Sequence, residues 1–182
     1  GPAESTVIQH LLITGASSGI GEAIARYAAD KHLSVTAIAR RSSRLARLHD
    51  TYPNIHPETA DIADKKQVAK AMARAIKVHG PVDCAILNAG IYQPVDATDI
   101  NSDVFDAHMN VNYSGIVYCL ESLVPAMVER GSGHIALMGS TAGYRGLPRS
   151  AAYGPTKAAV QNLAECLYFD LNPHHIKVQI IN

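Results

Sequence analysis

The chain has 182 residues, of which 47% are hydrophobic and 18% charged, with 16 basic and 16 acidic side chains. This composition fits one globular domain with its own core and excludes a disordered chain, which needs low hydrophobicity and a strong net charge. A formal net charge of zero and a pI of about 7.3 give no electrostatic reason to expect nucleic acid or an anionic membrane as the main partner. We therefore expect any anion site to be local.

No continuous apolar run approaches the roughly 20 residues that span a bilayer, and the N-terminus lacks a signal-peptide pattern. Gly1 and Pro2 are typical of the remnant of a cleaved tag and are left out of the fold prediction. Three cysteines, an odd number, lie in apolar segments without metal-ligand spacing: Cys84, Cys119 and Cys166. They predict reduced core residues, no metal site and a cytoplasmic protein.

Strand and helix patterns alternate in the first half of the chain. The expected elements are a strand over Val7–Ile13, a helix over Glu22–Ala29, a strand over Val35–Ala39, a helix over Ser42–His49, a weak strand over Asn54–Ala60 that contains Pro57, and a helix that follows Asp64. Asp64 is an expected N-cap, and Gly80 with Pro81 is expected to end this helix.

The second half continues the alternation. The expected elements are a strand over Val82–Leu87, a long helix over Val104–Arg130 interrupted near Pro125, a strand over His134–Met138, a helix over Ala151–Leu171 and a strand over Lys177–Ile181. Repeated alternation of this kind predicts an α/β fold in which helices cover both faces of a parallel sheet. No linker or internal repeat divides the chain, so residues 1–182 are expected to form a single domain.

A glycine-rich turn joins the first expected strand to the first expected helix. It reads Thr14-Gly15-Ala16-Ser17-Ser18-Gly19-Ile20-Gly21, with the spacing G-x3-G-x-G. Residues without a Cβ let the backbone turn tightly and present helix N-terminal N–H groups to a pyrophosphate. Glycines also serve plain turns, so the turn alone is a weak signal.

The G-x3-G-x-G spacing and four further segments together resemble those of short-chain dehydrogenases/reductases. Asn88-Ala89-Gly90 resembles the N-A-G motif of that family, Asn112 matches the asparagine of its catalytic tetrad, and Ser140 is followed by the Y-x-x-x-K pair Tyr153 and Lys157. The resemblance covers Val7 to Asn182. It implies a Rossmann-type doubly wound parallel sheet and an enzyme that interconverts a carbonyl and a secondary alcohol with a nicotinamide cofactor.

The chemistry of the tyrosine and lysine agrees with the resemblance. Four residues apart on a helix, Tyr153 and Lys157 lie on one face about 6 Å apart along the axis. A nearby cation lowers the pKa of an acid by roughly 1–3 units from the value of about 10 for free tyrosine, toward the range useful for proton transfer. Without the neighbouring motifs, such a pair is more often a surface contact.

The resemblance implies a role for each catalytic candidate. Tyr153 is the general acid in reduction and the base in oxidation, while Ser140 holds the substrate oxygen. Lys157 also binds the nicotinamide ribose, and Asn112 supports a water that links the lysine to solvent. The implied cofactor-binding residues are Gly15, Ser17, Ser18, Gly19, Ile20, Gly21, Arg40, Arg41, Asp61, Ile62, Asn88, Ala89, Gly90, Tyr153 and Lys157.

The end of the second strand bears on the choice of cofactor. An acidic residue there binds the ribose 2′-hydroxyl of NAD, whereas arginine accommodates the 2′-phosphate of NADP. Ala39 is followed by Arg40 and Arg41, so NADP(H) is preferred, with NAD(H) as the alternative. Ser17 stands where many NADP-preferring relatives carry a second basic residue, which tempers the preference. Asp61 either flanks the adenine with Ile62 or caps a helix.

Several other features leave alternatives open. His174 and His175 resemble a metal pair but lack a spaced third ligand, so a place near a helix C-terminus is favoured. Arg145 and Arg149 either select an anionic substrate or are ordinary exposed loop residues. The segments 112–127 and 159–171 resemble the helices through which family members form homodimers and homotetramers, although their apolar residues also suit the core of one chain.

Two expectations concern the whole protein. A non-catalytic NADP(H)-binding regulatory or scaffold protein is the alternative function, because fold does not fix function. The chain stops at Asn182, before the segment in which the family builds its substrate pocket and before its last helix and strand. We therefore expect a longer native protein that acts on a small-molecule carbonyl or alcohol.

Overall fold

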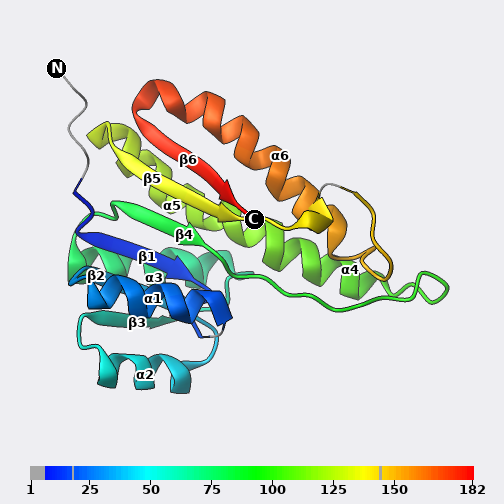
Figure 1. Ribbon diagram of the computed structural model, residues 1–182, viewed down its shortest axis with the longest axis horizontal. Helices are drawn as coiled ribbons and strands as arrows, with labels where there is room; N and C mark the ends of the chain where they lie inside the picture. Colours follow the sequence, from blue (N-terminus) through cyan, green and yellow to red (C-terminus); the bar gives the residue numbers. More distant parts are fainter. Residues whose placement is uncertain (1–6, 18, 144) are drawn as a thin grey trace.

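One parallel sheet organises the computed structural model, which describes residues 7–17, 19–143 and 145–182. Its strands lie in the order β3-β2-β1-β4-β5-β6 and every neighbouring pair is parallel (Figure 1). The strands are β1 (His10–Thr14), β2 (Ser34–Ala39), β3 (Ile55–Thr59), β4 (Cys84–Leu87), β5 (Gly133–Met138) and β6 (Ile176–Ile181). This arrangement confirms the predicted α/β fold with a parallel sheet.

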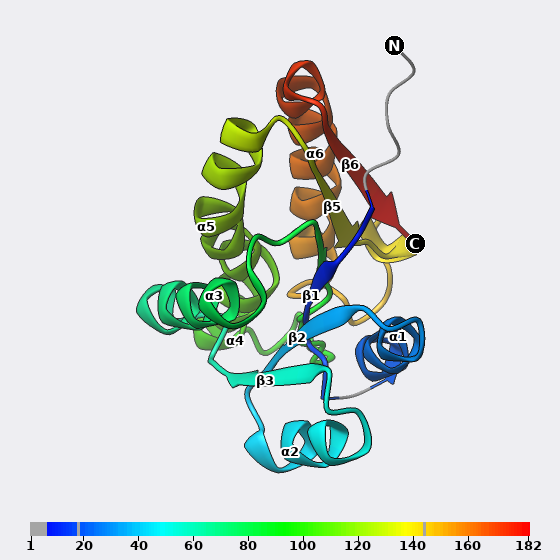
Figure 2. The ribbon, with the colours of Figure 1, turned by 90° about the vertical axis from the view of Figure 1, so that its left-hand side faces the viewer.

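Helices cover both faces of the sheet. They are α1 (Gly19–Asp30), α2 (Ser42–Thr51), α3 (Lys65–His79), α4 (Ser102–Met109), α5 (Gly115–Arg130) and α6 (Gly154–Leu171), with short turns η1 (Asn110–Ser114), η2 (Thr141–Gly143) and η3 (Asn172–His174). One core cluster joins the sheet to α1 and α2, and a second joins the opposite face to α3, α5 and α6. Figure 2 shows α1 on one side of the strands and α3 and α5 on the other.

Local sequence signals explain the bounds of the third strand and third helix. The Asp64 side chain accepts hydrogen bonds from the backbone N–H groups of Lys66 and Gln67, which caps α3 as predicted. Gly80 follows the helix with a φ of 79°, a conformation that glycine adopts without strain. Pro57 is tolerated in β3 because this strand lies at the edge of the sheet.

The long helix expected over Val104–Arg130 is interrupted, but the predicted position is wrong. The break is η1, a π-helical turn between α4 and α5, whereas Pro125 lies inside α5. Proline removes the hydrogen bond to the carbonyl of Glu121, and both residues are exposed, so water can replace the lost donor. The helix therefore continues through Pro125.

Within the part of the chain that the structure describes, the stretch Ser102–Arg130 is long and apolar enough to cross a membrane, with a mean hydropathy of 1.2 over its best window. Its buried residues include Ile116, Leu120 and Leu123, which pack in the core cluster between the sheet and helices α3, α5 and α6. A core helix of a globular domain passes the same test of length and composition, so this stretch is explained by its packing.

Two other predictions need correction. The helix expected from Ala151 begins at Gly154, because residues 151–153 form turns and Tyr153 is the N-cap residue. Cys84 and Cys119 are buried, and burial raises the pKa of their thiols to about 11 and about 12, but Cys166 is exposed. Cys166 lies on the outer side of α6 and is therefore not a core residue.

Candidate active site

The candidate residues gather at the carboxyl ends of β1, β4 and β5. After β1 the chain enters α1 on one face of the sheet, and after β4 it leads to α4 and α5, of which α5 packs on the other face. The Thr14 hydroxyl accepts hydrogen bonds from the backbone N–H groups of Asn88 at 3.0 Å and Ala89 at 3.1 Å. The ends of β1 and β4 are thus held together at the point where ligands of open α/β sheets bind.

The glycine turn packs against the N-A-G segment. A Cβ at Gly15 would lie 2.9 Å from the Cα of Ala89, and Gly15 also has a φ of 66°. A Cβ at Gly21 would collide with the carbonyl oxygen of Gly15 and lie 2.7 Å from Nδ2 of Asn88, which itself donates to that carbonyl at 3.3 Å. These two positions require glycine because the backbones approach so closely.

Gly19 and Ile20 face more open space than Gly15 and Gly21. Gly19 has a φ of 54°, and nothing lies within 4 Å of the place where its Cβ would be. Ile20 is exposed, whereas Ser17 is buried. The expected contact of Ser18 lies outside the described residues. The turn therefore combines tight packing at Gly15 and Gly21 with free space at Gly19, as a phosphate-binding loop requires.

Both candidate arginines lie beside this turn. Arg40 and Arg41 are exposed at the end of β2, and they line a groove of about 180 Å³ whose wall also includes Gly15, Ser17 and Ile62. Asp61 is not among the lining residues. Its carboxylate accepts the backbone N–H of Ala63 at 3.0 Å. The alternative of a helix cap at Asp61 is wrong, because Asp64 caps α3.

Asn112 lies in the π-helical turn η1 and is fully buried. Its Oδ1 accepts the backbone N–H of Ile91 at 2.7 Å, and its Nδ2 donates to the Ile91 carbonyl at 2.9 Å and to the Thr156 hydroxyl at 3.1 Å. A Cβ at Gly90 would lie 3.3 Å from Oδ1 of Asn112 and 4.0 Å from Nζ of Lys157. Asn112 and Lys157 therefore meet around Gly90, where a larger residue would crowd both.

Ser140, Tyr153 and Lys157 come from the loop after β5 and the start of α6. Lys157 is only 7% exposed, and its Nζ donates to the carbonyl of Met138 at 3.1 Å and lies 5.8 Å from the centre of the Tyr153 ring. Burial lowers the pKa of Lys157 from its ordinary value, which makes its ammonium group a better proton donor. Ser140 Oγ accepts the backbone N–H of Ala142 at 3.2 Å, which leaves the hydroxyl proton available for another acceptor.

Thr156 is a residue of the site that the sequence did not indicate. It is fully buried, and its hydroxyl donates to the Tyr153 carbonyl at 2.6 Å while accepting from Nδ2 of Asn112. The hydroxyl thereby joins the first turn of α6 to η1. A threonine inside the Y-x-x-x-K pattern was visible, but its partner lies 44 residues away in the sequence.

Tyr92 and His108 were also missed. The Tyr92 ring meets the Tyr153 ring edge to face, with centroids 4.9 Å apart and an interplanar angle of 75°. Buried His108 accepts the backbone N–H of Gln93 at 3.0 Å. No motif marks either position, and only the fold brings them to the site.

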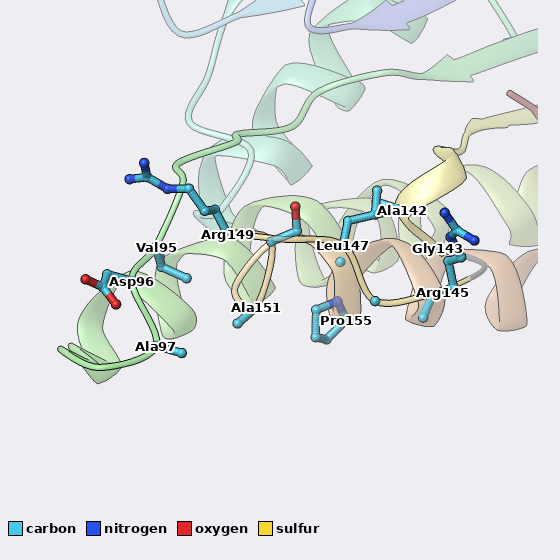
Figure 3. Close-up of a pocket in the computed structure, with 14 residues that line it drawn as sticks. Val95, Asp96, Ala97, Ala142, Gly143, Arg145, Leu147, Arg149, Ala151 and Pro155 are labelled. Atoms are coloured by element: carbon cyan, nitrogen blue, oxygen red, sulfur yellow. The ribbon is translucent and has the colours of Figure 1, made fainter.

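A separate cavity lies near the start of α6. It has a volume of about 810 Å³ and lies between residues 95–97, the loop after η2 and the first turns of α6 (Figure 3). Gly154, Pro155 and Ala158 of α6 line it, whereas Tyr153 and Lys157 are not among its lining residues. Arg145 and Arg149 also line this cavity.

Among the residues that the structure describes, no group of three or more histidine, cysteine or acidic side chains is placed to hold a metal ion. His175 follows the short turn η3 as its C-cap, with a φ of 64°, and His174 is exposed beside it. This pair therefore lies near the C-terminal end of α6, where the sequence favoured it.

The strand order and the glycine turn define a doubly wound fold of the Rossmann type. The chain belongs to the short-chain dehydrogenase/reductase family, because the model of the short chain dehydrogenases matches residues 9–182. A curated relative from Drosophila melanogaster, named dehydrogenase/reductase SDR family protein 7-like, is 34% identical over 180 residues. The match covers 94% of this chain and 55% of that relative, so the chain spans about half of its length.

Solved structures are similar in backbone as well. A 3-ketoacyl-(acyl-carrier-protein) reductase from Brucella melitensis, complexed with NADH, is 30% identical with a TM-score of 0.91, over 96% of this chain and 74% of that one. A variant of an actinorhodin polyketide ketoreductase, solved with NADPH, is 26% identical with a TM-score of 0.91, over 95% of this chain and 69% of that one. Nicotinamide cofactors of both kinds thus occur among the structural relatives.

Proposed function

We propose that the full-length protein is an NADP(H)-dependent oxidoreductase that interconverts a carbonyl and a secondary alcohol by hydride transfer. The main supporting observation is the buried Lys157 ammonium group, which lies 5.8 Å from the centre of the Tyr153 ring and donates a hydrogen bond to the carbonyl of Met138, two residues before Ser140. The glycine turn, which has open space at Gly19, supports the same proposal. Family membership and relatives named as ketoreductases support the same reaction class.

The residues present suit a nicotinamide dinucleotide. The open space at Gly19 and the groove between Gly15, Arg40 and Ile62 would take the pyrophosphate and the adenosine half. Gly90 leaves room beside Lys157 and Asn112, where a Cβ would lie 4.0 Å from Nζ of the lysine. When bound there, the cofactor supplies or accepts the hydride.

The side chains of this chain supply orientation and proton transfer. Ser140 has a free hydroxyl proton, which can donate to the substrate oxygen and stabilise developing negative charge. Tyr153 gives its phenolic proton to that oxygen during reduction and takes it back during oxidation. Lys157 uses one of its three N–H groups on Met138, and its positive charge favours the phenolate of Tyr153. Asn112 is hydrogen-bonded to Ile91 and to Thr156, and these bonds hold the start of α6, which carries Tyr153 and Lys157, in position.

The test of the reaction is cofactor oxidation by the full-length protein across a panel of aldehydes and ketones, with secondary alcohols tested in reverse. We expect carbonyl-dependent loss of NADPH absorbance. Tight NADPH binding without turnover of any substrate would instead favour the alternative, a non-catalytic NADP(H)-binding protein.

The preference for NADP(H) over NAD(H) rests on Arg40 and Arg41. Both are exposed at the groove beside the glycine turn, where planar guanidinium groups suit a 2′-phosphate. We expect Arg40→Ala to raise the Kd for NADPH about tenfold, the effect of losing one charge-assisted contact, while the Kd for NADH changes little. Arg44→Ala, an exposed arginine on α2, is the matched control. Equal Kd values for the two cofactors in the wild type would overturn the preference.

The proposal extends to assembly and location. Tyr168 and Phe169 leave large apolar surfaces exposed on α6, which supports a homodimer or homotetramer formed through α5 and α6. Sedimentation of the full-length protein tests this, and a monomer at micromolar concentration would exclude it.

We propose a cytoplasmic location, since the described cysteines are all free thiols, and cell fractionation tests it.

A further inference from the structure

Two buried side chains hold the short segment that follows β4. Asn112 binds the backbone of Ile91 twice, at 2.7 Å through Oδ1 and at 2.9 Å through Nδ2. His108 is 1% exposed, and its Nε2 accepts the backbone N–H of Gln93 at 3.0 Å. Its Nδ1 bonds the Val104 carbonyl at 2.7 Å and must donate, because a carbonyl oxygen only accepts. The backbone is therefore fixed on both sides of residue 92.

Between these two anchors stands an aromatic ring that is largely in water. Tyr92 is 55% exposed, and its ring packs edge to face against Tyr153 with centroids 4.9 Å apart. Exposed aromatic rings are common, but this one has an anchored backbone and lies against the proposed proton donor. A group held in place before binding loses little freedom when a ligand arrives, so its contacts contribute more of their energy to affinity.

We propose that Tyr92 is a specificity-determining residue whose ring forms one wall of the substrate subsite and selects carbonyl compounds with a flat aromatic group next to the carbonyl carbon. This inference rests on the proposed oxidoreductase function. A substrate oxygen held by Ser140 and Tyr153 brings the substituents of its carbonyl carbon beside the ring that contacts Tyr153.

Ring chemistry favours an aromatic substituent over an aliphatic one. Aromatic rings pair edge to face or offset-stacked at centroid distances of about 4.5–7 Å, and these pairs gain more than the burial of equal apolar area. The Tyr92–Tyr153 contact already has this geometry, and the exposed part of the Tyr92 ring is free to make a second contact of the same kind. A saturated ring of the same size gains only the area term.

The experiment compares acetophenone with cyclohexyl methyl ketone, two substrates of similar size that differ in aromaticity, using the full-length protein and NADPH. We expect Tyr92→Ala to lower the ratio of their kcat/KM values by about two- to tenfold, the range that an aromatic pair contributes. Tyr92→Phe should keep the ratio, because the ring remains. Tyr27→Ala removes an exposed tyrosine on α1 and should leave the ratio unchanged. An unchanged ratio in Tyr92→Ala, or an equal loss in Tyr92→Phe, overturns the proposal.

A binding measurement separates this inference from the proposed function. NMR titration of both ketones in the presence of NADP+ reports their Kd values without turnover. If the wild type reduces no ketone but binds acetophenone more tightly, and Tyr92→Ala loses that preference, the reaction is wrong and the subsite stands. If the wild type turns over both ketones and binds them equally, the subsite is wrong and the reaction stands.

Discussion

The two ends of the sheet both bury polar side chains, but they use them differently. At the carboxyl end, Asn112 and Lys157 bond to backbone atoms and to Thr156, and the half-buried Ser140 and Tyr153 keep their reactive groups available. Buried groups at this end therefore position others.

At the amino end, three histidine rings pack against one another, and Asp83 and Asn54 bond to backbone groups. The ring of His79 lies 5.1 Å from that of His10 and 5.6 Å from that of His56. Further along β3, Glu58 accepts from His56 and from Arg74 at 2.8 Å each. These contacts join the end of α3 to β1 and β3. Changes at the carboxyl end should therefore affect rate, and changes at the amino end should affect stability.

The largest effect is expected from Tyr153→Phe. It removes the proposed proton donor but keeps the ring that packs on Tyr92, so the fold loses little. General acid–base catalysis contributes about 10²- to 10⁴-fold, and kcat should fall by that factor. Turnover with NADPH, measured together with the Kd for NADPH and the melting temperature, checks this. Full turnover with intact cofactor binding would show that Tyr153 has no catalytic role.

Gly21→Ala should lower both stability and cofactor affinity, although Gly21 lies at the carboxyl end of the sheet. The new methyl would collide with the Gly15 carbonyl and approach Nδ2 of Asn88 to 2.7 Å, and these two groups are hydrogen-bonded to each other. Overpacking of this kind costs about 1–3 kcal/mol of unfolding free energy, and the displaced turn should bind NADPH more weakly. Urea unfolding and cofactor titration measure the two effects. Gly146→Ala, where nothing lies within 4 Å, is the control for stability.

The residues involved explain what the sequence could predict. The glycine turn, Asn88, Ser140, Tyr153 and Lys157 carry local patterns at strand ends, and a parallel sheet brings strand ends to one edge. Even β3 was predictable in outline, because Pro57 suits an edge strand. Local patterns thus identified the elements and most of the candidate residues.

The contacts between distant segments could not be predicted in the same way. Thr156 accepts a hydrogen bond from Asn112, 44 residues earlier, and Gln93 donates one to His108, 15 residues later. The π-helical turn η1 carries no glycine or proline until Gly115, whereas Pro125 is conspicuous in the sequence but tolerated in the structure. The contacts between distant segments and the position of the helix break therefore become visible only in the folded structure.

Thr156→Val should lower kcat by a moderate factor and tests whether a buried polar group at the carboxyl end of the sheet positions Tyr153. Valine keeps the shape of threonine but removes the hydroxyl that joins Tyr153 to Asn112. We expect kcat to fall about tenfold, as for the loss of one buried hydrogen bond, with a smaller change in KM because Tyr153 is the proposed proton donor in the transition state. Thr156→Ser should restore kcat, since it keeps the hydroxyl. An equal loss in both variants would indicate a packing role instead.

The smallest effect concerns acid stability at the amino end of the sheet. Desolvation lowers the pKa of His10 and of His79 below the ordinary value of 6.5, and the neighbouring histidines His10 and His56 lower that of His79 further. The hydrogen bond to the Gly80 carbonyl and the charge of Asp83 oppose the shift at His10 without reversing it. The Nε2 atom of His79 is buried without a hydrogen-bond partner among the described residues, so a proton there would have no acceptor.

The sign of the pH dependence follows from these lowered pKa values. Below a pH of about 6.5, His10 and His79 bind protons more readily in the unfolded chain than in the folded chain. Their contribution to stability is therefore fully present above that pH and declines as the pH falls toward the lowered pKa values. His79→Phe keeps an aromatic ring against His10 and His56 but cannot be protonated, so its urea midpoint should change less between about pH 7.5 and about pH 5.5. Exposed His174, replaced by glutamine, should follow the wild type. If His79→Phe loses as much stability in acid as the wild type, the pH dependence arises elsewhere, and the amino end of the sheet stabilises the fold through packing alone.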